Sequence, residues 1–116
     1  MAAEPAPPKI FTLFFVSGTA ELTPESRQKV SKILETIRDR DSRDISVVGH
    51  SDRKGSEELN WELSLERAEA VHQILMEAGV PTDIISTTSH GEGNPLIPTD
   101  DDVPEPRNRR VEVTVR

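Results

Sequence analysis

The sequence predicts an α/β sandwich in which two helices pack on a mixed sheet of about four strands, in the order β-α-β-α-β-β. Two amphipathic helical patterns lie over residues 24–40 and from Ser56 or Glu57 to about Ala78. Short β-rich segments precede, separate and follow them, and the last one alternates strictly between apolar and polar residues. The length of 116 residues is enough for one domain and too short for two independent cores.

The first half of the chain is predicted to supply a strand, a helix and a second strand. Residues 9–16 are apolar on both faces, which is typical of a central strand covered on both sides. Thr23 is a good N-cap for the helix over 24–40, and Pro24 suits its first turn. Residues 44–49, which have turn residues on either side, are predicted to form a short strand.

The second helix is predicted to end before Gly79 and Pro81. A weaker third strand follows over 83–89, and residues 91–107 are expected to form a long loop that covers part of the sheet. The last strand, 108–116, is predicted to turn Val111, Val113 and Val115 inward and to turn four residues toward water: Arg110, Glu112, Thr114 and Arg116.

The composition excludes several classes of function. Lys and Arg number 14 against 21 Asp and Glu, and this net charge of −7 disfavours a binder of nucleic acid or of anionic membranes. The chain has no cysteine, so disulfides, thiolate nucleophiles and Cys-based zinc sites are excluded. Aromatic residues make up 3% of the chain, which argues against base-stacking platforms. No apolar stretch approaches the roughly 20 residues of a membrane span.

Residues 1–8 are rich in Pro and Ala and lack the basic start and apolar run of a signal peptide. They are predicted to be a stiff linker or tail, which leaves residues 9–116 as the domain. Two possibilities stay open. Either the protein is cytosolic, or the sequence begins after a removed leader or an anchor, and any membrane contact then runs through that missing part.

The second predicted helix carries a cation on its apolar stripe. At about 100° per residue, one arc holds Leu59, Leu63, Ala70, Val71, Ile74 and Ala78. Arg67 projects near the middle of this arc, with Asn60 and Ser64 at its edge. A guanidinium in such a place is costly unless it is paired and hydrogen-bonded. It predicts a buried structural salt bridge, an Arg that reaches out to solvent, or a receptor for a carboxylate or phosphate.

Asp52 follows the strand predicted over 44–49, at the edge of the sheet where open α/β folds bind ligands. In one interpretation it caps a turn or pairs with Arg53 or Lys54. In the other, its loop folds back over the helix, and Asp52 shares a crevice with Arg67. Such a pair suits a zwitterion, with the ammonium on Asp52 and the carboxylate on Arg67.

Two kinds of enzyme are disfavoured. His50, Asp52, His72 and His90 are residue types that bind metals, but they lack HExxH or comparable spacing, and neither a metal nor another cofactor is expected. Ser51 completes the residue types of a hydrolase triad with His50 and Asp52. These three are consecutive, and no G-x-S-x-G elbow exists, so no catalytic residue is expected.

One ordered signature runs over about residues 10–116. Its segments are 14–22 (FFVSGTAEL), 48–52 (VGHSD), 60–68 (NWELSLERA) and 108–113 (NRRVEV). In the pattern GH-x-D, N-x-x-L-S-x-x-R-A and N-R-R-V, the chain resembles the OmpA-like (OmpA/MotB/Pal) peptidoglycan-binding domain. Two positions depart from the family pattern. Ser51 stands where the family usually has Thr, and Leu59 where it usually has Tyr.

The resemblance implies a non-catalytic module that binds peptidoglycan through the diaminopimelate of its stem peptide. Asp52 and Arg67 would grip the zwitterionic end of diaminopimelate. The same groove would be lined by Asn60, Leu63, Ser64, Gly18, Thr19 and Ala20. It would be supported by His50, Ser51, Asn108 and Arg109. The resemblance also implies a periplasmic location, tied to the outer or inner membrane, with the Pro-rich start as a tether.

A protein-interaction or dimerisation module with a degenerate wall-binding site is the alternative, and a homodimer belongs to it. The acidic segment 99–105 (TDDDVPE) is then the candidate contact surface. The ordinary explanation for such a charge run is a solvated surface.

Overall fold

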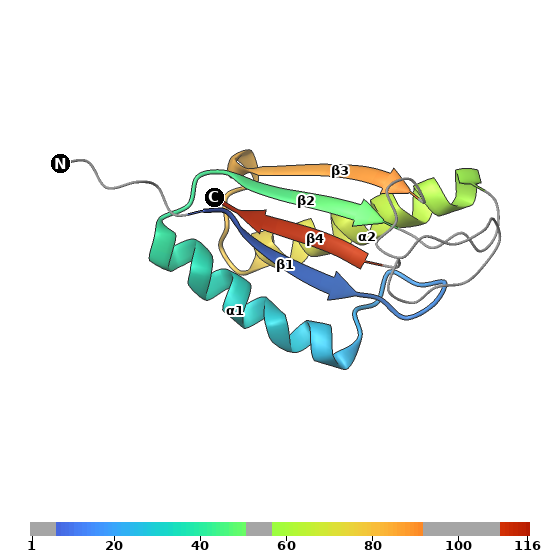
Figure 1. Cartoon of the computed structure of the whole chain (residues 1–116), viewed down its shortest axis with the longest axis horizontal. Coiled ribbons are helices and arrows are strands. Elements are labelled where there is room, and N and C mark those ends of the chain that lie inside the picture. The colour runs from blue at the N-terminus through green and yellow to red at the C-terminus, as the bar shows by residue number, and fades with distance from the viewer. Residues whose placement is uncertain (1–6, 51–56, 92–109) are drawn as a thin grey trace.

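Two long helices pack on one four-stranded sheet in a computed structural model that describes residues 7–50, 57–91 and 110–116 (Figure 1). The elements in chain order are β1 (Lys9–Phe14), α1 (Pro24–Arg40), β2 (Ile45–His50), α2 (Glu57–Glu77), the short 3-10 helix η1 (Thr82–Ile84), β3 (Ile85–Gly91) and β4 (Arg110–Val115). The strand order across the sheet is β1-β4-β2-β3. β2 and β3 are parallel, whereas β4 is antiparallel to β1 and to β2. The predicted α/β class and element order are confirmed.

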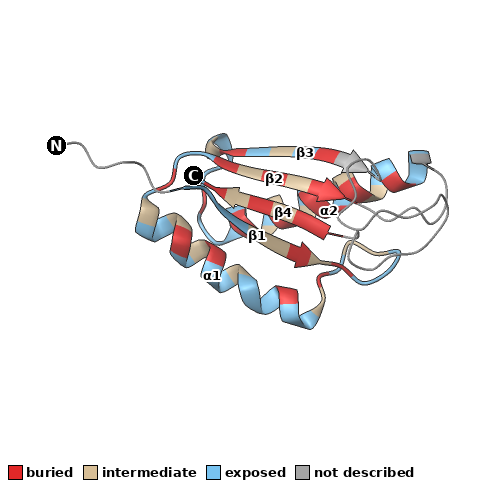
Figure 2. Cartoon of the chain, in the orientation of Figure 1, coloured by how far each residue is buried: buried red, intermediate tan, exposed pale blue. Residues whose placement is uncertain are grey.

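The core lies between the two helices and one face of the sheet. Alternate residues of β2 and β4 turn toward it, and Val47 and Val113 have no exposed surface. They form one cluster with Ile33 of α1 and with Val71 and Leu75 of α2. Figure 2 shows the buried positions alternating along the strands and recurring on one side of each helix. Aliphatic side chains therefore supply most of this core, as the low aromatic content predicts.

The first helix begins and ends as its sequence predicts. Thr23 caps it, since the Thr23 hydroxyl oxygen accepts a hydrogen bond from the Ser26 backbone N–H at 3.3 Å. Pro24 takes the first helical position. At the other end Asp41 adopts a left-handed conformation with φ of 47°, and its N–H donates to the Arg38 carbonyl at 3.1 Å.

The first predicted strand is an edge strand, so the prediction of a central strand covered on both sides is wrong. β1 lies at one end of the sheet, and its Ile10 is 62% exposed. Lysines lie over the aromatic rings that suggested burial. The Lys9 Nζ is 5.6 Å from the centroid of the Phe11 ring, and the Lys29 Nζ is 5.7 Å from that of Phe14. Cations thus cover part of the apolar surface that the sequence assigns to the core.

The later strands differ from their predicted limits. η1 precedes β3, which therefore starts two residues later than predicted and extends to Gly91. In β4 the inward valines are confirmed, but Arg110, predicted to face water, is 3% exposed. Its Nε donates to Glu112 Oε1 at 2.8 Å, and this ion pair accompanies its burial. The loop predicted over 91–107 and the linker predicted over 1–8 lie almost wholly outside the described residues.

Gly49 lets α2 lie directly against β2. A Cβ atom built at Gly49 would be 1.9 Å from the Ser64 carbonyl oxygen and 3.2 Å from the Ala68 Cβ. No side chain fits in that space, so the backbones of the strand and the helix touch at this point. This contact sets the height of the first half of α2 above the sheet.

We predict that Gly49→Ala lowers the free energy of unfolding by about 3 kcal/mol, because the methyl group must push α2 off β2. Urea unfolding measures this loss. Gly79→Ala is the matched control, since Gly79 has φ of 101° and open space at its Cβ. It should cost about 1 kcal/mol through backbone strain alone. Equal losses in the two variants would contradict the close approach.

Candidate functional site

The buried stripe of α2 is polar at its start and apolar at its end. It consists of Asn60, Ser64, Arg67, Ala68, Val71 and Leu75, none more than 5% exposed. The buried stripe is turned away from the predicted arc, because Leu59 is 63% exposed and Ala78 is also exposed, whereas Val71 is buried as predicted. The contact at Gly49 explains the difference. It brings the helix close to the sheet at Ser64 and Ala68, whose small side chains lie in the buried stripe.

Arg67 is fully buried, with an exposed fraction of 0%. Its Nε donates a hydrogen bond to the Thr19 carbonyl oxygen at 2.8 Å. The central carbon of the guanidinium lies 5.4 Å from the centroid of the Phe15 ring, within the range of a cation–π contact. The predicted core-facing position is confirmed, and the interpretation in which this side chain reaches out to solvent is wrong.

The turn between β1 and α1 is fixed by its own hydrogen bonds. Thr19 closes it, since its N–H and its hydroxyl both donate to the Val16 carbonyl, at 3.1 and 2.9 Å. The Glu21 N–H in turn donates to the Thr19 hydroxyl oxygen at 3.1 Å. Gly18 supplies the left-handed conformation that the turn requires, with φ of 72°. The Thr19 carbonyl is therefore held in place as the acceptor for Arg67, and Ala20 is half-buried beside it.

Ser64 joins α2 to β3. Its hydroxyl donates to the Trp61 carbonyl at 2.8 Å and shares a hydrogen bond with the Ser89 hydroxyl. Both serine side chains are buried. Ser64 thus lies one helical turn before Arg67 and fixes that part of the helix against the sheet. Leu63, on the neighbouring side of α2, is half-buried.

The structure places some of the predicted site residues, and others lie outside the residues that it describes. It brings Thr19 to Arg67, and it puts Asn60 and Ser64 on the same buried stripe. His50, interpreted as a loop residue, is the last residue of β2 and is 1% exposed. Four predicted residues lie outside the described residues: Ser51, Asp52, Asn108 and Arg109.

The described ranges show no group of three or more His, Cys, Asp or Glu residues that could hold a metal ion. His72 bonds instead to two hydroxyl groups, with its Nδ1 2.8 Å from Thr87 Oγ1 and its Nε2 2.9 Å from Thr82 Oγ1. It thereby links α2 to β3 and η1. Within those ranges, no helix is both long enough and apolar enough to cross a membrane.

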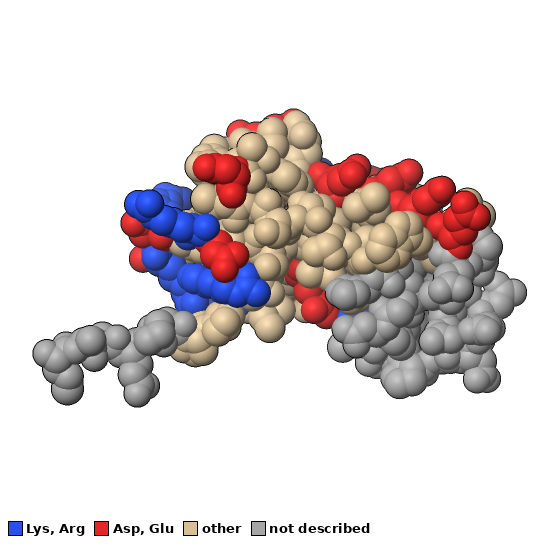
Figure 3. Space-filling model, turned by 90° about the horizontal axis from the view of Figure 1, so that it is seen from above, with Lys and Arg blue, Asp and Glu red and all other residues tan. Residues whose placement is uncertain are grey.

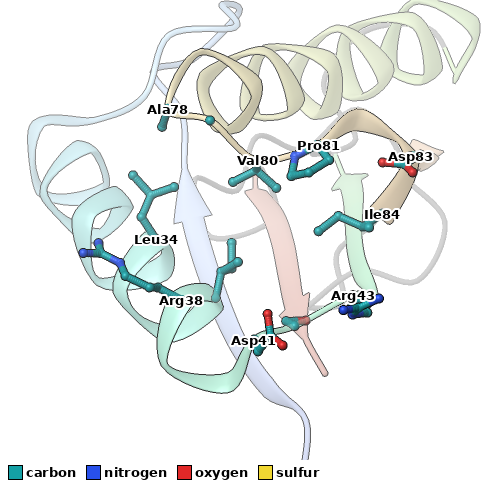
Figure 4. Close-up of a pocket in the computed structure, with 12 residues that line it drawn as sticks. Leu34, Arg38, Asp41, Arg43, Ala78, Val80, Pro81, Asp83 and Ile84 are labelled. Carbon is teal, nitrogen blue, oxygen red and sulfur yellow. The ribbon is translucent and has the colours of Figure 1, made fainter.

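A separate cleft of about 640 Å³ opens where α1 and α2 end (Figure 4). Leu34 and Val80 contribute apolar surface, while Arg38, Asp41 and Asp83 contribute charge. None of the residues predicted for binding lines it. The cleft lies at the end of the helices opposite to the Thr19 turn, so it is not part of the Arg67 site (Figure 1).

Sequence reasoning missed two contributors to the Arg67 site, Phe15 and Ser89. A signal for Phe15 existed, because it alternates with Leu13 along the first strand and so faces the helices. No comparable signal existed for Ser89, which lies among Ser and Thr residues that are alike in sequence.

The fold and the ordered signature agree with one family. The OmpA family matches residues 14–109. The chain therefore belongs to the OmpA family.

Individual relatives support this assignment. An outer membrane protein of Gluconacetobacter diazotrophicus is 33% identical over 94% of this chain, which spans 30% of that protein. The OmpA-like domain of FopA1 from Francisella tularensis superposes with a TM-score of 0.82 at 22% identity, over 93% of this chain and 71% of that one. The peptidoglycan-associated lipoprotein of Burkholderia pseudomallei superposes with a TM-score of 0.79 at 23% identity, over 90% and 89% of the two chains. At 22% and 23% identity, these two structural matches support the fold alone.

We predict that Ser64 and Ser89 are energetically coupled. Ser64→Ala and Ser89→Ala should each lower the free energy of unfolding by about 1 kcal/mol. The double variant should lose about 0.5–1 kcal/mol less than the sum, because the two hydroxyls serve each other. Ser31→Ala is the control, since this exposed hydroxyl bonds within α1, to the Gln28 carbonyl. Additive losses in the Ser64 and Ser89 cycle would contradict the coupling.

Proposed function

We propose that this chain binds peptidoglycan without covalent chemistry, through the diaminopimelate of the stem peptide. The observation that carries the proposal is the complete burial of Arg67 on α2, where the Thr19 carbonyl accepts a hydrogen bond from its Nε. Membership of the OmpA family and likeness to a peptidoglycan-associated lipoprotein support the ligand class. The chain is proposed to act as a binding domain and not as an enzyme.

In this proposal, Arg67 receives the carboxylate at the zwitterionic end of diaminopimelate. The planar guanidinium can offer two parallel N–H donors to a carboxylate, a geometry that a lysine ammonium lacks. The Thr19 carbonyl accepts from Nε at 2.8 Å and so orients the plane of the guanidinium. The ligand carboxylate must itself become buried to reach Arg67, and the ion pair strengthens because the surroundings exclude water.

Asp52 is proposed to accept the ligand's ammonium group. A ligand that lacks either charge would leave a protein charge without its counterpart in a dry groove, which is costly. Selectivity for a zwitterion then comes from the penalty on wrong ligands as well as from attraction to the right one. The groove is proposed to include Asn60, Leu63, Ser64, Gly18, Thr19 and Ala20, with His50, Ser51, Asn108 and Arg109 in support.

The proposed place of action is the periplasm, attached to the outer or inner membrane through parts of a longer protein. The named relative is an outer membrane protein of which this chain spans 30%. Residues 1–8 would serve as the tether. Many tethered copies facing one polymeric wall bind firmly by avidity even when each contact is weak.

Co-sedimentation with purified sacculi tests the proposal. The wild-type chain should pellet with sacculi and be released by free diaminopimelate. Arg67→Lys and Asp52→Asn should each weaken binding by about tenfold or more, because about 1.4 kcal/mol of charge-assisted hydrogen bonding corresponds to that factor. Far-UV circular dichroism checks that each variant is folded.

Arg43→Lys is the matched control. Arg43 is exposed and lines the cleft at the opposite end of the helices, so its replacement should leave sacculus binding unchanged. The competition with free diaminopimelate uses the wild-type chain, so its result does not depend on whether a variant folds. A wild-type chain that stays in the supernatant, or that pellets and ignores diaminopimelate, would refute the proposal.

A further inference from the structure

Two hollows lie along the seam between α1 and α2. The first is the cleft of about 640 Å³ at the ends of the helices, which Leu34 lines on one side and Val80 on the other (Figure 4). The second has a volume of about 400 Å³, and Val30 and Ile74 line it from the two helices. Val30 lies one turn before Leu34, and Ile74 lies one turn before Ala78, which lines the cleft. The two hollows therefore adjoin and form one seam groove.

One stripe of α1 forms a wall of the seam groove. Its members recur at spacings of three and four residues: Arg27, Val30, Leu34, Ile37, Arg38 and Asp41. The three aliphatic residues pack partly against the core and are half-buried. From Arg27 to Arg38 the stripe runs for about 16 Å, which is three turns of helix. The groove is therefore long enough for an elongated partner.

The opposite wall comes from the end of α2 and from the segment that follows it. It is also mainly apolar, and its members are Ile74, Ala78, Val80, Pro81 and Ile84. Ile74 and Ile84 are half-buried, while Ala78 and Pro81 are exposed. Both walls thus leave aliphatic surface open to solvent. Contiguous apolar surface with polar residues around it is typical of a contact site.

The α1 rim of the seam groove is basic along its middle. Arg27 and Arg38 are both exposed there, eleven residues apart. Within the parts of the chain that the structure describes, neither guanidinium forms an ion pair with a carboxylate. Acidic residues lie only at the ends of the groove, Glu21 at one end and Asp41 and Asp83 at the other. Two cations, three helical turns apart, are thus available to a partner.

The two helices differ in charge. α1 carries five basic and three acidic residues, whereas α2 carries one basic and six acidic residues. Figure 3 shows Lys and Arg side chains gathered at the end of the molecule where α1 stops, and acidic side chains along the other half. An acidic group on a partner is therefore attracted to α1 and repelled by α2, which fixes the side of the groove that it takes.

We propose that the seam groove binds an amphipathic α-helix of a partner protein, with an apolar stripe and an acidic flank. The apolar stripe packs on the aliphatic walls, as in other complexes in which a helix lies in a hydrophobic groove. Two carboxylates on the flank, eleven residues apart, pair with Arg27 and Arg38, because that spacing repeats every three turns in both helices. This interaction does not depend on peptidoglycan binding.

A second copy of this chain fits the groove less well. The occupant must present a row of apolar side chains on one outward stripe of a helix. Among the described residues, the exposed large hydrophobic residues on α2 are Leu59, Trp61 and Met76, and α1 has none. Leu59 and Trp61 lie about 160° apart around the helix, and Met76 is at its other end. Neither helix of a second copy therefore supplies the apolar stripe.

The probe is a capped, fluorescein-labelled helical peptide of about five turns. Its leucines recur at spacings of three and four residues, and two glutamates lie eleven residues apart beside them. Fluorescence anisotropy should show saturable binding whose affinity falls as ionic strength rises, because exposed charges are screened. A peptide of the same composition with its leucines spread around the helix keeps the charge and lacks the stripe. It should bind at least about tenfold more weakly.

Charge reversal tests the two arginines. The double variant Arg27→Glu with Arg38→Glu should weaken binding by about tenfold or more, and replacement of both peptide glutamates by lysine should restore it on that variant. Lys29→Glu with Lys32→Glu is the matched control, since both lysines are exposed on α1 and neither lines the groove. This control should leave binding unchanged, and far-UV circular dichroism checks that each variant is folded.

Three results would overturn the proposal. The first is the absence of saturable binding, or equal affinity for the two glutamate peptides, which would show that the apolar stripe does not matter. The second is a lysine peptide that fails to restore binding to the folded double variant. The third is dimerisation of the chain alone that Leu34→Asp abolishes without loss of the fold, which would assign the groove to a second copy.

Discussion

The hydrogen bond from Arg67 Nε to the Thr19 carbonyl joins the middle of α2 to the turn after β1, across 48 residues of chain. Three local features make this contact possible. Gly49 lets α2 touch β2, the Ser64 and Ser89 hydroxyls fix that half of the helix against β3, and the Thr19 hydroxyl closes the turn. A guanidinium is thereby held inside a core whose other members are mainly aliphatic. Holding a cation there requires acceptors, and the Thr19 carbonyl is one of them.

In the proposed wall-binding role, this arrangement serves recognition and not stability. A well-packed apolar side chain often stabilises a core as much as a buried ion does, or more. In that proposal, a desolvated guanidinium that is oriented by a carbonyl and lies over the Phe15 ring is prepared for a planar anion, because little ordering remains to be done on binding. The proposed wall-binding role uses this preparation.

The sequence predicts the element order, both helices and the burial of Arg67 because hydrophobic periodicity and capping residues such as Thr23 and Gly79 act locally. It predicts β1 as a central strand, although β1 lies at the edge of the sheet. Apolar residues on both faces of a strand suggest two covering layers, and the sequence does not reveal that lysines lie over Phe11 and Phe14 instead. It also places the buried side of α2 too far toward Leu59, which is 63% exposed. That side is set by backbone contact at Gly49, a long-range fact that a helical wheel does not contain. The partnership of Ser64 with Ser89 has no local signal, and the predicted roles of Asp52, Asn108 and Arg109 stay predictions.

Side-chain ¹⁵N NMR of the arginines tests the central claim most directly. In the wild-type chain the Arg67 Nε–H should give a signal that exchanges slowly with water, because it is buried and bonded to Thr19. On addition of free diaminopimelate, the terminal N–H signals of Arg67 should shift, while those of exposed Arg38 stay in place. Arg67 signals that remain unmoved at saturating ligand would contradict a guanidinium that serves as the receptor for the wall.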